Sequence, residues 1–120
     1  MENAYYSFDV GTQKYLVLTF EYEPRQSVLD WAKTIIEANP ERRVIISTHA
    51  YMDRTKELLS RTYGANGGDV IWEQVASQYA NVIMVVSGHA TGTDIVRRED
   101  QGVNGNTVYQ FMIDDSNLNY

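Results

Sequence analysis

The chain contains two histidines, and each of them follows a short apolar run. His49 comes after the run from Arg43 to Thr48, and His89 comes shortly after the run from Val82 to Val86. If the two runs are parallel neighbouring strands, their carboxyl ends meet at one edge of a sheet, where ligands gather in α/β proteins. Two imidazole nitrogens held about 2 Å from one ion suit a divalent metal. The alternative is that each histidine is a surface or hydrogen-bonded loop residue without a ligand.

Three aspartates are further candidates for this chemistry. Asp114 and Asp115 follow the last predicted strand and are potential metal ligands, although aspartate pairs near a chain end are more often solvated turn residues. Asp53 comes soon after His49, and its carboxylate is a candidate acceptor that would orient the imidazole of His49. A role at a helix start or in a loop is the alternative that its position favours.

A serine hydrolase is the competing interpretation of the same segments. Ser47 and Ser87 each lie two residues before a histidine, so hydroxyl and imidazole would share one face of a strand. However, the chain has no Gly-x-Ser-x-Gly motif, and no acidic residue is evidently placed to orient a catalytic base. The pattern favours metal chemistry.

The composition limits the classes of protein that fit. The chain has 120 residues, a formal net charge of -6 and no cysteine. This length predicts one domain over residues 1–120, and the acidic charge disfavours a nucleic-acid scaffold that binds through counterion release. Any metal must be held by His, Asp, Asn or Glu. No apolar run approaches the roughly 20 residues needed to span a bilayer, and the first residues lack the basic and then apolar layout of a signal peptide.

The first half of the chain predicts a hairpin, a helix and a buried strand. Residues Tyr5 to Val10 and Tyr15 to Tyr22 are rich in aromatic and β-branched residues and flank a short loop that contains glycine. Their tyrosines suggest a carbohydrate platform, although such strands usually form cross-strand aromatic pairs. Helical spacing of apolar residues then runs from a cap at Gln26 or Ser27 to the stop at Asn39-Pro40. The continuous apolar run that follows is typical of a strand covered on both faces.

The second half predicts a loop, a helix, a strand and a final hairpin. Residues Gly64 to Gly68 indicate a flexible loop, and Asp69 is a good N-cap for a helix that ends at Asn81. After the strand that precedes His89, residues Thr93 to Arg98 and Asn106 to Ile113 form the hairpin. The predicted fold class is therefore α/β, a mixed β-sheet with two helices and flanking hairpins.

The order of these segments resembles the carboxyl-terminal half of a calcineurin-like metallophosphoesterase. In that family a comparable hairpin precedes a helix that often opens with Gln and carries Trp, and two later strands end in a lone His and in Gly-His-x-His. The segments that carry the resemblance are Tyr5-Tyr6-Ser7-Phe8-Asp9, Tyr15-Leu16-Val17-Leu18, the helix with Gln26 and Trp31-Ala32, Thr48-His49-Ala50-Tyr51 and Ser87-Gly88-His89. The resemblance implies one half of an α/β/β/α sandwich.

The resemblance also implies a two-metal hydrolase of phosphate mono- or diesters that uses Mn, Zn or Fe. By position, His49 and His89 would bind the same metal of the pair. The second His of the family's Gly-His-x-His motif is replaced by Thr91, whose hydroxyl is a poorer ligand for a transition metal. The family's Asp-x-His, Gly-Asp-x-x-Asp and Gly-Asn-His motifs do not occur before Tyr5, and the pair Gly68-Asp69 lies in the wrong place to supply the bridging carboxylate.

The expectation is therefore a carboxyl-terminal part of a larger phosphoesterase that is inactive by itself. The alternative is a non-catalytic α/β module for binding or assembly with a relic metal site. In the implied sandwich, the inner face of this sheet would have lost its partner, so we expect a homodimer that packs sheet on sheet or exchanges hairpins. Terminal hairpins that fold over the face and leave a monomer are the alternative.

Overall fold

The structure, a computed structural model, describes residues 3–88 and 95–113, and they form a mixed sheet with helices. The elements in chain order are β1 (Ala4–Val10), β2 (Gln13–Phe20), α1 (Gln26–Ala38), β3 (Arg43–Thr48), α2 (Gly68–Ile71), the π-helical turn η1 (Trp72–Ala76), β4 (Val82–Ser87), β5 (Ile95–Gln101) and β6 (Thr107–Ile113). The predicted fold class is confirmed at this level: an α/β protein with a mixed sheet, two helices and flanking hairpins.

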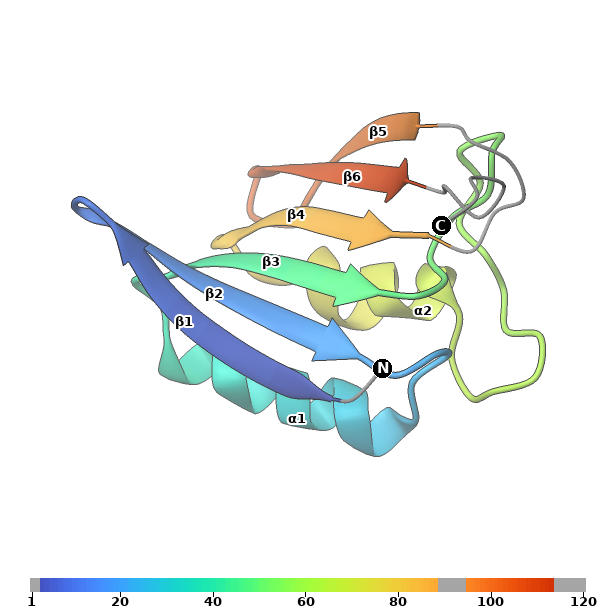
Figure 1. Cartoon of the computed structure of the whole chain (residues 1–120), viewed down its shortest axis with the longest axis horizontal. Helices are drawn as coiled ribbons and strands as arrows, with labels where there is room; N and C mark the ends of the chain where they lie inside the picture. Colours follow the sequence, from blue (N-terminus) through green and yellow to red (C-terminus); the bar gives the residue numbers. More distant parts are fainter. Residues whose placement is uncertain (1–2, 89–94, 114–120) are drawn as a thin grey trace, which may run out of the picture.

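The six strands lie in the order β1-β2-β3-β4-β6-β5 (Figure 1). The four central strands are parallel to one another, and β1 and β5 are antiparallel to their neighbours. Both helices follow the usual crossover role, because α1 connects β2 to β3 and α2 with η1 connects β3 to β4. All four central strands therefore end at the same edge of the sheet, which we call the carboxyl edge.

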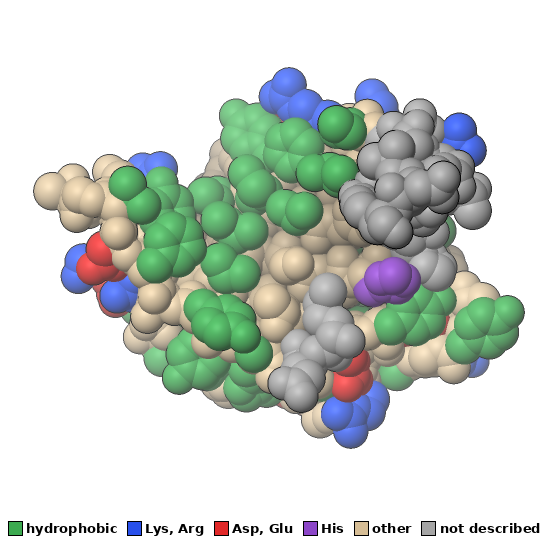
Figure 2. All heavy atoms as spheres, in the orientation of Figure 1, with side chains coloured by type: hydrophobic (Ala, Val, Ile, Leu, Met, Phe, Trp, Pro, Cys, Tyr) green, Lys and Arg blue, Asp and Glu red, His purple; other side chains and the backbone are tan. Residues whose placement is uncertain are grey.

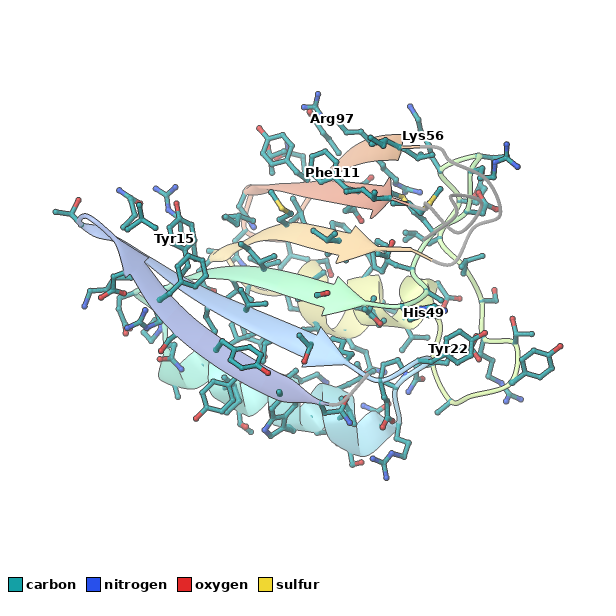
Figure 3. All side chains as sticks on the ribbon, viewed as in Figure 1. Tyr15, Tyr22, His49, Lys56, Arg97 and Phe111 are labelled. Atoms are coloured by element: carbon teal, nitrogen blue, oxygen red, sulfur yellow. The ribbon has the colours of Figure 1, made fainter. Side chains whose placement is uncertain are left out.

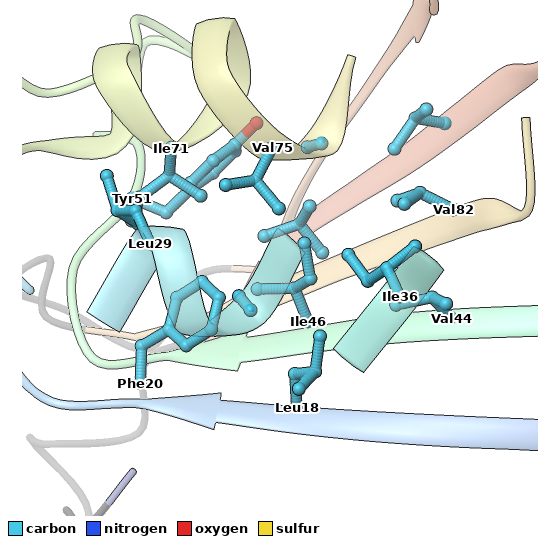
Figure 4. Packing of buried hydrophobic residues seen from close by; sticks show 14 of the residues in the cluster. Leu18, Phe20, Leu29, Ile36, Val44, Ile46, Tyr51, Ile71, Val75 and Val82 are labelled. Carbon is cyan, nitrogen blue, oxygen red and sulfur yellow. The ribbon is translucent and has the colours of Figure 1, made fainter. Parts of the chain in front are cut away.

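Both helices pack on the same face of the sheet (Figures 1 and 4). Alternate residues of the central strands point toward the helices, so β2 buries Leu16, Leu18 and Phe20 while the residues between them are partly exposed. A side-chain hydrogen bond also joins α1 to η1, since Gln26 Nε2 donates to Gln74 Oε1 at 2.7 Å. The main core residues are Leu16, Leu18, Phe20, Leu29, Ala32, Ile36, Val44, Ile46, Tyr51, Met52, Ile71, Val75, Val82, Val85, Val108 and Met112.

The opposite face of the sheet, here called the open face, is not covered by any described helix. Figure 2 shows apolar side chains gathered across it. The pairing registers place on this face Tyr6, Phe8, Val10, Tyr15, Val17, Arg43, Ile45, Ser47, Met84, Val86, Ile95, Arg97, Glu99, Tyr109, Phe111 and Ile113. The prediction that the strand before His49 is covered on both faces is therefore wrong for the part of the chain that the structure describes. Its apolar run occurs because β3 has Ile45 on the open face.

Several boundaries differ from the sequence-based ones for local reasons. The first hairpin has a two-residue turn, in which Gly11 adopts a φ of 61° that favours glycine. Strand β5 continues to Gln101 because its backbone pairs with Thr107 of β6. A bulge at Ile83 lets Val82 and Val85 both point to the core, since Val44 pairs with Val82 and Ile45 with Met84.

The start of α2 also differs from the prediction. The N-cap residue is Gly67, and Asp69 lies within the first turn, where its carboxylate accepts a hydrogen bond from Val70 N at 2.8 Å. Gly67 and Gly68 are buried, and a Cβ on Gly68 would lie 1.8 Å from Tyr51 O. These glycines permit close backbone packing, so the prediction of a flexible loop from Gly64 to Gly68 does not describe this segment.

Within the described residues, no helix is both long and apolar enough to cross a bilayer.

Candidate functional site

His49 lies at the carboxyl edge of the sheet, immediately after β3, and its side chain is exposed. The adjacent parallel strand β4 ends nearby, because Gly88 N donates a hydrogen bond to His49 O at 3.1 Å. Gly88 is the residue before His89 in the sequence. The fold therefore brings the backbone of His49 into contact with Gly88, the residue that precedes the second predicted ligand, His89.

The ring of Tyr22, just beyond β2, lies beside the imidazole of His49 (Figure 3). The ring centroids are 5.5 Å apart and the planes meet at 65°, which is an edge-to-face arrangement. Sequence reasoning placed Tyr22 in the aromatic hairpin and did not connect it with His49. The ends of β2 and β3 make this contact, which the parallel pairing of Phe20 with Thr48 establishes.

Three predicted candidates lie outside the described residues, namely His89, Asp114 and Asp115, and so does Thr91, the residue at the place of the family's second histidine. The described residues that precede them lie side by side at the carboxyl edge: β4 and β6 are parallel, and Ser87 pairs with Met112. The chain therefore leaves both strands at the carboxyl edge.

Asp53 has a loop role in the structure. Its carboxylate accepts hydrogen bonds from Thr55 N at 2.8 Å, from Thr55 Oγ1 at 2.6 Å and from Glu57 N at 3.1 Å. The Thr55 hydroxyl is the main reason that the pKa of Asp53 lies below its usual value, and the two backbone donors act in the same direction. These contacts shape the loop after His49, which was the alternative that its position favoured.

The described residues do not form a complete metal site. Within residues 3–88 and 95–113, no group of three or more His, Asp or Glu side chains is arranged to hold an ion. A site that includes His49 would need ligands from outside those ranges or from another chain.

Ser47 and Ser87 point to opposite faces of the sheet. Ser47 pairs with Val86 and lies on the open face, whereas Ser87 is buried and its hydroxyl donates a hydrogen bond to Phe111 O at 3.3 Å. The pairing register thus separates the two hydroxyls, and Ser87 has a structural role. This arrangement gives no support to a serine hydrolase.

A buried polar network under β5 and β6 was not predicted. The Tyr51 hydroxyl donates a short hydrogen bond to Gln110 Oε1, and Gln110 Nε2 donates to Asp100 Oδ2 at 2.6 Å. Asp100 in turn pairs with Arg98, whose guanidinium also donates to Lys56 O at 2.6 Å. Burial and the nearby Asp100 charge raise the pKa of Tyr51, so its hydroxyl stays protonated and donates. The available signal was a glutamine between Val108 and Met112 on a core-facing side of a strand.

A second unpredicted feature holds the loop beside the carboxyl edge. Glu23 is buried, with a φ of 44°, and its carboxylate accepts hydrogen bonds from Thr62 N at 2.6 Å, Tyr63 N at 2.8 Å and Gly64 N at 2.6 Å. Burial acts to raise the pKa of Glu23, but these three donors outweigh it and the pKa is lowered. The loop is thereby fixed with the Tyr63 side chain almost fully exposed.

A shallow hollow of about 520 Å³ is lined by Lys56, Arg97, Arg98 and Glu99 (Figure 3). Glu99 pairs with Arg97 and Asp100 pairs with Arg98, so most of the positive charge is already balanced. The hollow has the chemistry of a surface ion-pair cluster.

Comparison with protein-family models, with curated proteins and with solved structures finds no match to this chain. The resemblance to the metallophosphoesterases therefore stays a prediction that rests on the residues themselves.

Proposed function

We propose that this chain contributes His49 and His89 to a divalent-metal site of a phosphoesterase that hydrolyses phosphate mono- or diesters. The observation that carries the proposal is the hydrogen bond from Gly88 N to His49 O, which ties together the ends of two parallel strands. Carboxyl ends of neighbouring parallel strands are the usual place for a ligand in such sheets. Rigid strand ends are also suitable supports for imidazole ligands, which must converge on one ion.

The described residues support only part of such a site. Bound Mn, Zn or Fe ions would supply Lewis acidity toward a phosphate ester and activate water in the parent enzyme. This chain's described contribution is to position His49, which the edge contact with Tyr22 and the backbone contact with Gly88 orient. The remaining ligands, including a bridging carboxylate, would come from a further part of the parent protein. We therefore expect weak metal binding by this chain.

Titration calorimetry with Zn²⁺ or Mn²⁺ tests the proposal on four proteins: wild type, His49→Ala, His89→Ala and Glu41→Ala. Glu41 is an exposed carboxylate in the connection between α1 and β3, away from the carboxyl edge, and serves as the control. We expect weak binding that either histidine substitution abolishes and Glu41→Ala leaves intact. Binding should also weaken below about pH 6, because imidazole must be neutral to coordinate a metal. Identical isotherms for all four proteins would overturn the proposal.

The second candidate function is a non-catalytic module for binding or assembly. The observation that favours it is the open face, which carries a broad apolar surface without a described cover. The two candidates differ in the calorimetric result, because an assembly module needs neither histidine. A chain that binds no metal yet associates through the open face would be assigned to this second class.

A further inference from the structure

The open face exposes large apolar side chains from one edge of the sheet to the other. Its most exposed members are between 39% and 73% exposed: Tyr6, Phe8, Val10, Ile95, Tyr109 and Ile113. They come from β1, β6 and β5, at the two sides of the sheet, and half-buried apolar residues of β2, β3 and β4 lie between them. Every strand of the sheet therefore contributes apolar side chains to this face, and Figure 2 shows groups of them over the left and upper parts of the view.

The size of this surface lies at the upper end of what a soluble monomer usually exposes. With about 150–250 Å² for a fully exposed aromatic side chain, the exposed fractions of Tyr6, Phe8 and Tyr109 alone amount to roughly 300 Å². Val10, Ile95 and Ile113 add a comparable area, and the half-buried residues add more. The largest apolar patch of a typical monomer is about 300–600 Å², whereas a stable interface buries about 800 Å² on each partner. With the half-buried residues included, the open face approaches the area that each partner of a stable interface buries.

The charges on the open face favour a partner with the same surface. Among the described strand residues, the charged side chains on this face are Arg43, Arg97 and Glu99. Arg97 pairs with Glu99 and also stacks on the Tyr109 ring, with its guanidinium carbon 5.5 Å from the ring centroid. The face thus carries a local charge near +1, although the whole chain carries -6. Two copies that meet through this face keep their acidic surfaces apart. A strongly charged partner would find few opposite charges on the face with which to form ion pairs.

We propose that, in the isolated chain of these 120 residues, a second copy covers the open face, so that two sheets pack face to face in a twofold dimer with the helices outside. A twofold axis makes one apolar surface its own complement, which needs no second type of partner. The two inner faces then form a common core about 10 Å thick, as in other sheet-on-sheet packings. The polar rim at Arg97 and Glu99 would lie at the margin of this core.

Light scattering after size exclusion, across roughly the micromolar range, measures the outcome. We expect wild type at twice the 13.7 kDa of one chain and the double variant Tyr6→Lys/Tyr109→Lys at 13.7 kDa. Both side chains are exposed in the single chain, so lysine at these positions leaves the monomer fold intact; circular dichroism checks this. The variant Tyr63→Lys/Val103→Lys is the matched control, because it adds the same charge at exposed apolar residues outside the strands. It should remain a dimer.

Two results would contradict the proposal. One is a wild-type monomer at every concentration, whether or not it binds a hydrophobic dye; dye binding would then point to a different occupant. The other is a dimer that survives Tyr6→Lys/Tyr109→Lys. The test is independent of the proposed metal site, since His49→Ala and His89→Ala should leave the dimer mass unchanged.

Discussion

At the residue scale, the clearest chemistry lies in side chains that hold backbone in place. The Glu23 carboxylate receives three backbone N–H groups from the loop of residues 62–64, and its own backbone O accepts from Ala65 N at 3.1 Å. Hydrogen bonds to a charged acceptor are stronger than neutral ones, and a buried donor that loses its acceptor is costly. Glu23 therefore fixes the loop next to His49 and Tyr22.

The first prediction is that Glu23→Gln lowers the free energy of unfolding by about 1–3 kcal/mol at pH 7. Glutamine keeps the shape of the side chain but removes the charge and one acceptor oxygen. Urea denaturation measures the change, and Glu41→Gln, at an exposed position, is the control that should stay within about 0.5 kcal/mol of wild type.

The same comparison has a defined pH dependence. Because the pKa of Glu23 is lowered in the folded state, its charged form stabilises the fold above the ordinary glutamate value of 4.5, and that contribution is lost as pH falls through the lowered pKa. The hydrogen bond with Arg25 holds the pKa of Glu21 at about 2, but that effect is common to both proteins. The stability difference between wild type and Glu23→Gln should therefore shrink below pH 4.5. A difference that grows in acid would contradict this role.

At the scale of elements, α2 is seated by close contact between backbones. Gly68 begins the helix directly against Tyr51 O, and Leu59 N donates a hydrogen bond to the same oxygen at 2.9 Å. Tyr51 also carries the buried hydroxyl that bonds to Gln110 of β6. Tyr51, in the segment after His49, is thus in contact with both α2 and the sheet. These contacts fix the position of the chain next to the carboxyl edge.

The second prediction is that Gly68→Ala destabilises the protein by at least about 1–3 kcal/mol, because the added methyl group forces the backbone of Tyr51 and α2 apart. Gly88→Ala is the matched control, since its Cβ would lie 3.4 Å from Ile113 O, an ordinary contact distance. Thermal unfolding should show a lower midpoint for Gly68→Ala and little change for Gly88→Ala. Equal midpoints would mean that α2 can shift without cost.

At the scale of the whole molecule, one sheet presents a helix-covered face, an open face and a carboxyl edge with His49. The open face and the edge lead to separate proposals, one for assembly and one for metal binding. The described residues provide no group of three metal ligands, and a face-to-face dimer would not by itself add a ligand type to the edge. That this chain is inactive in isolation stays a prediction, which an activity assay can test.

The third prediction is that this chain with added Mn²⁺ hydrolyses para-nitrophenyl phosphate esters no faster than Mn²⁺ alone. The reason is that two-metal hydrolysis needs ligands that clamp both the attacking and the leaving oxygen, and two imidazoles on one side of a site do not provide them. Release of para-nitrophenol is the measurement. Turnover that His49→Ala abolishes would show that the chain completes the site by itself.

The sequence by itself determined the elements and their order. Apolar periodicity in β2 and α1 and the glycine at the tip of the first hairpin are local signals. A helix between two strands favours a parallel crossover, so it could be predicted that β3 and β4 end at one edge, where Gly88 N meets His49 O. That this chain belongs to a phosphoesterase stays a prediction, because no family model, curated protein or solved structure matches it.

Only the tertiary structure decided which faces are buried and which polar groups meet. Gln110 reaches Tyr51 across 59 residues of sequence, and Glu23 reaches Gly64 across 41. The periodicity of β3 cannot reveal that both helices lie on one face, because Val44 and Ile45 are equally apolar and only packing separates them. Contacts between distant segments depend on how the elements are packed against one another, and local sequence patterns do not contain that information.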